Sequence, residues 1–167
     1  MLGFVVDPDS PDYVSPAQYQ ALVGWVSGPL RVAEIISPSK VSLPDVINHY
    51  APDLLHVALS SLNQLPDQDL PLVLELPFTD MPHANAIDPS RFKIEYLLIT
   101  NLTLTSKHIT FLSAPPVLVA IENPIASIAD LLQKIHARGI ALHGSRELTT
   151  GLKDYDHLSG ILEELND

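Results

Sequence analysis

The chain has 167 residues, an apolar fraction of 46% and a formal net charge of −11. A chain of this length can bury one hydrophobic core, so we expect a single domain over residues 1–167. The negative net charge repels the phosphates of nucleic acids and membranes. No stretch of the sequence is apolar enough to span a bilayer. The absence of cysteine excludes disulfides and thiolate chemistry. We therefore expect a cytoplasmic protein with neither a nucleic-acid nor a membrane partner.

The first predicted unit is a strand followed by a helix. An apolar run at about residues 2–6 predicts a strand, and a proline-rich loop follows it. Ser15 is a favoured N-cap residue, and Pro16 suits the first helical position, where its missing N–H costs nothing. The pair Gly28-Pro29 is expected to end the helix, and its inward residues recur at helical spacing. These inward residues are Tyr19, Leu22, Val23 and Val26.

The same alternation continues along the chain. An apolar run at residues 30–36 predicts the second strand, and Ser42 is expected to cap the short helix after it. Five further strands are predicted at residues 53–59, 71–76, 94–99, 117–121 and 139–142. Their starts lie roughly 18 to 28 residues apart, which is the spacing of βα units in a parallel sheet and not of hairpins.

The later helices differ in the strength of their signals. Asn123 is expected to cap a helix that Gly139 ends, and a last helix is predicted after Asp154 with Leu158, Ile161, Leu162 and Leu165 inward. Residues 60–70 and 77–91 hold several prolines, so we expect short helices or loops there. Seven βα units result, one fewer than a closed (β/α)8 barrel needs. A doubly wound α/β domain is the alternative.

Two motifs resemble a known family. Leu2-Gly3-Phe4, followed by Ser10-Pro11-x-Tyr13-Val14-Ser15-Pro16, is similar to the second strand and following loop of phosphoribosylanthranilate isomerase, a tryptophan-biosynthesis (β/α)8 barrel. Glu147 and the segment 150–154 resemble the family's V-E-x-x-P-G-I-K-D after its last strand. The resemblance implies a TIM-type barrel whose seven units correspond to the family's strands 2–8.

The resemblance also shows what the chain lacks. The family uses a cysteine on its first strand and an aspartate on its sixth as general base and acid, but this chain has no cysteine and carries Ile99 in the pattern Leu-Leu-Ile-Thr where the family has Leu-Leu-Asp-Thr. Asp12 replaces the arginine that would pair with the substrate carboxylate. We therefore assign no catalytic residue and no cofactor, and expect a protein without isomerase activity.

Phosphate binding is also weakened by comparison with the family. Its two glycines after the seventh strand correspond to about Ile121-Glu122 here. Gly144 and Ser145, after the last strand, could still offer backbone N–H groups to a small phosphorylated or anionic molecule, although a surface turn is the competing interpretation.

Six polar residues occur near the carboxyl ends of predicted strands, where such barrels assemble their sites. This polar ring comprises Asp7, Glu34, His56, Glu75, Glu122 and His143. Three interpretations stay open, because a shift of one residue in a strand would turn a side chain to the other face: groups exposed to solvent, a polar network in a vestigial pocket, or a repurposed site that could hold a divalent ion.

A competing hypothesis treats the chain as a ligand-binding or interaction module. Seven units would leave open strand edges, which favour pairing with a second copy. We also expect that Met1 is not the biological start, because an apolar strand follows it at once and an upstream strand and helix would complete the barrel.

Overall fold

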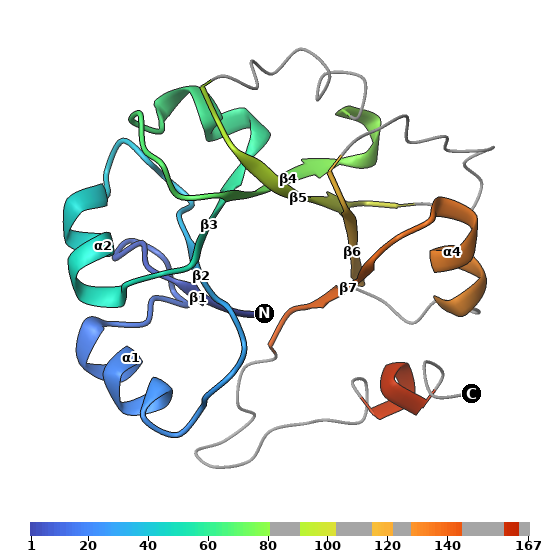
Figure 1. Cartoon of the computed structure of the whole chain (residues 1–167), viewed down its shortest axis with the longest axis horizontal. Helices are drawn as coiled ribbons and strands as arrows, with labels where there is room; N and C mark the ends of the chain where they lie inside the picture. Colours follow the sequence, from blue (N-terminus) through green and yellow to red (C-terminus); the bar gives the residue numbers. More distant parts are fainter. Residues whose placement is uncertain (81–90, 103–114, 122–127, 145–158, 164–167) are drawn as a thin grey trace. The chain divides into compact units, whose positions relative to one another are not determined.

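A computed structural model describes residues 1–80, 91–102, 115–121, 128–144 and 159–163. The chain divides into two compact units, residues 1–97 and 98–167. The strands are neighbours in the order in which they occur in the chain, β1 to β7 (Figure 1). The prediction of one domain is not tested by this division and stays a prediction.

The first unit alternates strands with short helices. Its elements are β1 (Leu2–Val5), α1 (Pro16–Val23), β2 (Arg31–Glu34), α2 (Leu43–Tyr50), β3 (Leu54–Ala58), the 3₁₀ helix η1 (Leu59–Gln64), β4 (Leu72–Pro77) and the 3₁₀ helix η2 (Phe78–Asp80). The strand β5 (Ile94–Thr100) crosses from the first unit into the second. The two 3₁₀ helices confirm short helical turns in the proline-containing connections, and residues 81–90 lie outside the described part.

The strands of the first unit pair in parallel. β1 pairs with β2, β2 with β3 and β3 with β4, so that Val5, Glu34 and His56 lie side by side in register and Glu75 lies beside Ala58. Parallel strands need a crossover connection, and α1 and α2 provide two of them. The prediction of parallel βα units is confirmed for these strands.

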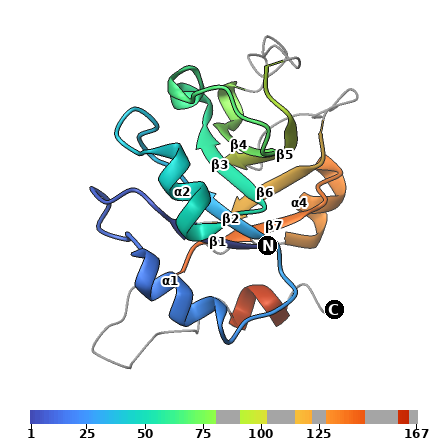
Figure 2. The same cartoon turned by 60° about the vertical axis from the view of Figure 1, so that its left-hand side comes forward.

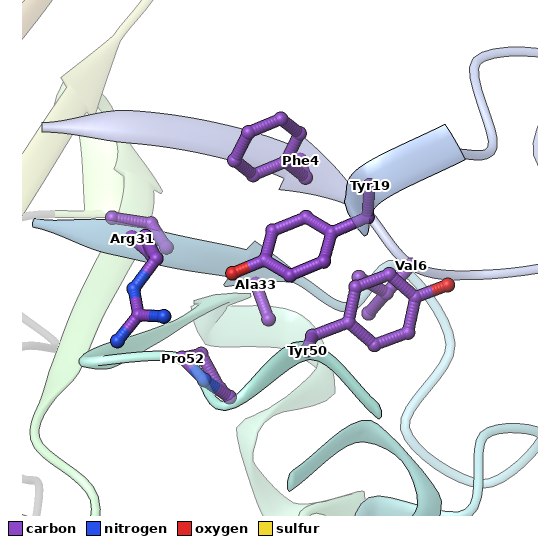
Figure 3. A pocket seen from close by; sticks show the side chains of 8 residues that line it. Phe4, Val6, Tyr19, Arg31, Ala33, Tyr50 and Pro52 are labelled. Atoms are coloured by element: carbon purple, nitrogen blue, oxygen red, sulfur yellow. The ribbon is translucent and has the colours of Figure 1, made fainter. Parts of the chain in front are cut away.

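The helices α1 and α2 pack on one face of this sheet. The ring of Phe4 in β1 meets the ring of Tyr19 in α1 edge to face, with centroids 5.0 Å apart, and Tyr19 in turn contacts Tyr50 of α2. Figure 3 shows these rings in a small pocket that Arg31 and Pro52 also line. Both helices lie on the same side of the strands in the two overall views (Figures 1 and 2). Since neighbouring residues on a strand point to opposite faces, Gly3 and Val5 belong to the other face.

The two predicted N-caps differ in the structure. Ser15 forms a full capping box with Gln18, in which each side chain bonds the other residue's backbone N–H. Ser42 occupies the N-cap position of α2 but makes no side-chain cap hydrogen bond. The predicted end of the first helix at Gly28 is wrong: α1 ends at Val23, and Leu22 and Val26 are 49% and 45% exposed, so of the predicted inward residues only Tyr19 is buried.

The second unit contains the end of β5, β6 (Val117–Ile121), α4 (Ile128–Ile135) and β7 (Gly139–Leu142), and β6 pairs with β7 in parallel. Ile128 and Ile135 of α4 are buried, whereas the expected cap Asn123 lies outside the described residues. The prediction that the helix ends at Gly139 is wrong, because α4 ends at Ile135, before His136, whose φ is 50°. The predicted strand at residues 139–142 is confirmed as β7.

The final helix is described only at residues 159–163. Ile161 is buried there, as predicted, but the inward prediction for Leu162 is wrong because its side chain is 51% exposed. Asp154, Leu158 and Leu165 lie outside the described residues.

Candidate functional site

Three members of the polar ring meet on the first unit's sheet. Glu34 ends β2, His56 lies in β3 and Glu75 lies in β4. The Nε2 atom of His56 is 2.9 Å from Oε2 of Glu75, and its Nδ1 atom is 3.6 Å from Oε2 of Glu34. The imidazole of the middle strand therefore bridges carboxylates from the two neighbouring strands.

Strand register explains why these side chains share a face. Glu34 lies beside His56, and Glu75 lies beside Ala58, two residues beyond His56, so all three point to the same side. Val5 is in register with Glu34, whereas its neighbour Phe4 contacts α1. The trio thus lies on the sheet face opposite α1 and α2, at the carboxyl ends of the strands.

Apolar side chains precede the trio on the same face. Val32 and Leu54 lie two residues before Glu34 and His56, and Val73 is in register with His56. All three are buried, with exposures of 7%, 2% and 4%. An apolar layer that excludes water lowers the local dielectric constant, and this strengthens the hydrogen bonds and ion pairs of a charged group beside it.

The environment of His56 favours the charged ring. Burial by itself opposes the charge, but the hydrogen-bonding contacts with Glu34 and Glu75 and their negative charges outweigh it and raise the pKa of His56 to about 9. At pH 7 the ring is therefore an imidazolium between two carboxylates, and the trio carries one net negative charge when both glutamates are ionised. The side chains of Glu34 and Glu75 are 30% and 35% exposed, so solvent reaches both carboxylates.

This arrangement does not suit a metal ion. The two carboxylates face opposite ring nitrogens, so one ion cannot bind a nitrogen of His56 and an oxygen of each glutamate together. Over the described ranges, no group of three or more histidine, aspartate or glutamate side chains has an arrangement that could hold a metal. Of the three interpretations, the polar network is the one that this geometry favours.

Asp7 has a different role. Its side chain is 2% exposed, and its two oxygens accept hydrogen bonds from the backbone N–H groups of Asp9, at 3.1 Å, and Ser37, at 2.9 Å. The bond from Ser37 fastens the loop after β1 to the loop after β2, and the bond from Asp9 lies within the first of these loops. The nearby ion pair of Lys40 with Asp9, at 2.8 Å, joins the same two loops.

The remaining predicted residues belong to the second unit. His143 and Gly144 are exposed directly after β7, and a Cβ added to Gly144 would meet open space, so no close approach requires glycine there. Glu122 and Ser145 lie outside the described residues. Neither the phosphate-binding prediction nor the role of His143 is tested.

Sequence reasoning predicted the members of the trio but missed the bridge. The signal for them was that Glu34, His56 and Glu75 each interrupt an apolar strand near its predicted carboxyl end. In β5, by contrast, the corresponding interruption is missing, because Ile99 is apolar and 0% exposed.

No protein-family model matches the chain, and a comparison with curated proteins gives no match. Solved structures do resemble it. Phosphoribosylanthranilate isomerase from Thermotoga maritima has a TM-score of 0.66 at 13% identity, and the match covers 98% of this chain and 86% of that one. The enzyme from Thermus thermophilus gives 0.60 at 17% identity, covering 99% and 86%. The enzyme from Pyrococcus furiosus gives 0.60 at 13% identity, covering 98% and 86%.

These likenesses show the fold: the chain has the TIM-type (β/α)-barrel fold of the phosphoribosylanthranilate isomerase structures. The predicted TIM-type fold is confirmed over a doubly wound domain, whereas the correspondence of the seven units to strands 2–8 stays a prediction. Over the residues that the structure describes, every helix is too short or too polar to cross a membrane.

Proposed function

We propose that the chain belongs to the phosphoribosylanthranilate isomerase lineage and does not catalyse the isomerisation. The observation that supports the lineage is a fold likeness covering 98% of the chain. The motifs at residues 2–16 and 147–154 suggest the register. In this register the seven strands would correspond to strands 2–8 of the family barrel, and residues 1–167 would form a single barrel-type domain.

The loss of activity rests on the chemistry of three positions. An aldose–ketose rearrangement needs a general acid and a general base, and each typically contributes about 10²- to 10⁴-fold to the rate. The chain has no cysteine to act as the base, and at the position that the motif assigns to the acid it has Ile99, which is fully buried and cannot donate a proton. Asp12 would repel the substrate carboxylate that an arginine attracts.

The test is growth of a tryptophan auxotroph that lacks its own isomerase. We expect no rescue by this chain, with an active isomerase expressed from the same vector as the positive control. Immunoblotting and circular dichroism of the purified chain would establish that the protein is present and folded. Rescue, or isomerisation by the purified chain above the buffer rate, would show that the proposal on activity is wrong.

A second candidate is a ligand-binding protein or a repurposed barrel enzyme that uses the trio. The supporting observation is that Glu34, His56 and Glu75 converge at the carboxyl ends of three adjacent strands, where barrels of this type place their sites. The net negative charge of the trio favours ligands that donate hydrogen bonds or carry positive charge. Thermal unfolding with panels of amines, sugars and sugar phosphates tests this, because a ligand that binds only the folded state raises the midpoint.

The two ligand classes separate the two candidate sites. A phosphorylated or anionic molecule would bind the turn at Gly144 and Ser145 instead, and inorganic phosphate is the simplest probe for it.

Pairing of two copies through strand edges is a separate proposal, and light scattering after size-exclusion chromatography tests it: a monomer across the micromolar range would contradict edge pairing.

A further inference from the structure

We propose that Glu34, His56 and Glu75 form a pH-operated clamp that holds the carboxyl ends of β2, β3 and β4 together while His56 is charged and releases one strand when the ring loses its proton. The clamp rests on the geometry of the first unit and not on the proposed lineage. Its failure would therefore leave the proposed lineage and the proposed loss of isomerase activity untouched.

The first support is the position of His56 on the middle strand. Each ring nitrogen faces a different neighbour, Nδ1 towards Glu34 of β2 and Nε2 towards Glu75 of β4. The ring side chain is only 13% exposed, so solvent screens these contacts less than it would at the surface. One side chain therefore links three strands at the same end of the sheet.

The second support is that residues of the clamp also take part in the backbone pairing. The carbonyl of Glu34 accepts the N–H of Val6 at 3.0 Å, and the carbonyl of His56 accepts the N–H of Ile35 at 2.9 Å. Directly beyond these bonds the chain enters the loops that Asp7 joins through Ser37. A movement of either clamp side chain is thus directly coupled to the last hydrogen bonds of the strands.

The third support is the donor count of the ring. An imidazolium donates from both nitrogens, whereas a neutral imidazole donates from one and presents a lone pair on the other. After deprotonation, one of the two carboxylates therefore faces a lone pair, and the two negative charges lose the cation between them. One side of the clamp must then open.

Among the described residues of the first unit, the charged side chains within ion-pair distance of His56 are Glu34 from β2 and Glu75 from β4. The helix η1, which follows β3, has no titratable residue, and the carboxylate of Asp7 is held by two backbone N–H groups.

Amide hydrogen exchange of the full chain tests the clamp. Protection factors, corrected for the intrinsic effect of pH, are measured for Val6 and Ile35 at about pH 7 and about pH 10. We expect about a tenfold or larger loss of protection at the higher pH, since one pKa unit corresponds to tenfold in an equilibrium. The amide of Asp53, which bonds the carbonyl of Arg31 at 2.8 Å at the opposite ends of the strands, is the internal control and should keep its protection.

Variants separate the clamp from general loosening. His56→Gln should remove the difference between the two pH values, and His49→Gln, a change at an exposed position of α2, should retain it. If His56→Gln does not fold, Glu75→Gln serves instead and should reduce the pH effect. Equal protection of Val6 and Ile35 at both pH values, a parallel loss at Asp53, or an unchanged pH effect in the folded variants would each overturn the clamp.

Discussion

The rings of Tyr19 and Tyr50 lie against each other, with centroids 5.1 Å apart and planes inclined by 57°. They occupy the same interface between helices and sheet, yet their hydroxyl groups differ. Tyr50 donates a hydrogen bond to the carbonyl of Val14 at 2.7 Å, whereas the buried hydroxyl of Tyr19 makes no hydrogen bond of ordinary geometry among the described residues, although its interaction with the guanidinium of Arg31 helps to raise the pKa of Arg31. Burial and the neighbouring Tyr13 raise the pKa of Tyr50, so this donor keeps its proton.

This difference predicts opposite effects of removing each hydroxyl. Tyr50→Phe should lower the free energy of unfolding by about 1 kcal/mol, because the carbonyl of Val14 loses its donor. Tyr19→Phe should be neutral or stabilising by up to about 1 kcal/mol, because a buried hydroxyl without a hydrogen bond of ordinary geometry is removed. Urea denaturation of both variants measures the two changes. If Tyr19→Phe lowered the free energy of unfolding as much as Tyr50→Phe, the Tyr19 hydroxyl would have to form a stabilising hydrogen bond.

The two serine N-caps provide a matched pair. Ser15→Ala should lower the free energy of unfolding by about 1 kcal/mol, because it removes the capping box with Gln18. Ser42→Ala should cost clearly less, since Ser42 makes no side-chain cap bond. Urea denaturation checks the ranking, and Ser15→Asp, which keeps a capping oxygen, should restore most of the loss. Equal losses for Ser15→Ala and Ser42→Ala would contradict the observed caps.

The trio makes stability depend on pH with a definite sign. The pKa of His56 is about 9 in the folded chain against an ordinary value of 6.5, so the folded state holds the proton more tightly. Its contribution, on the order of 3 kcal/mol, is fully present below about pH 6.5 and is lost as pH rises through about 9. The free energy of unfolding, measured by urea denaturation from pH 6 to pH 10, should fall across this window.

The control for this pH dependence is His56→Gln, which has no titrating ring. Its free energy of unfolding should be lower than that of the unchanged chain at pH 6 and should change less between pH 6 and pH 10. NMR titration of the His56 ring gives an independent measurement of its pKa. A midpoint near 6.5 would contradict the bridge between Glu34 and Glu75.

The buried position of Ile99 allows a prediction for the variant Ile99→Asp, which would restore the general acid of the family. Its side chain is 0% exposed, so Ile99→Asp would bury a carboxyl group in an apolar site and should cost about 3 kcal/mol or more. Ile99→Val, which keeps the site apolar, should cost about 1 kcal/mol. Thermal and urea unfolding measure both, and Ile99→Asp should gain no isomerase activity. An Ile99→Asp variant as stable as the unchanged chain would show that the site admits water.

Much of the architecture followed from local patterns. The near-continuous apolar strands and their spacing indicated parallel pairing, which β1 to β4 confirm, and Ser15 before Pro16 located the start of α1. Helix ends were predicted less well. Apolar residues continue at helical spacing past Val23 as far as Val26, but the helix stops because packing against the sheet, and not periodicity, decides where a short helix ends.

The sequence by itself determined which residue types stand near the strand ends: two glutamates and a histidine on three successive strands, and an isoleucine on β5. Only the tertiary structure decided which face each side chain occupies and which of them meet. A strand's side chains alternate with a period of two, so a shift of one residue in pairing exchanges the faces, and the pattern within one strand does not set its register against the next. The register of β2, β3 and β4 places Glu34, His56 and Glu75 together, while the backbone N–H groups of Asp9 and Ser37 engage Asp7.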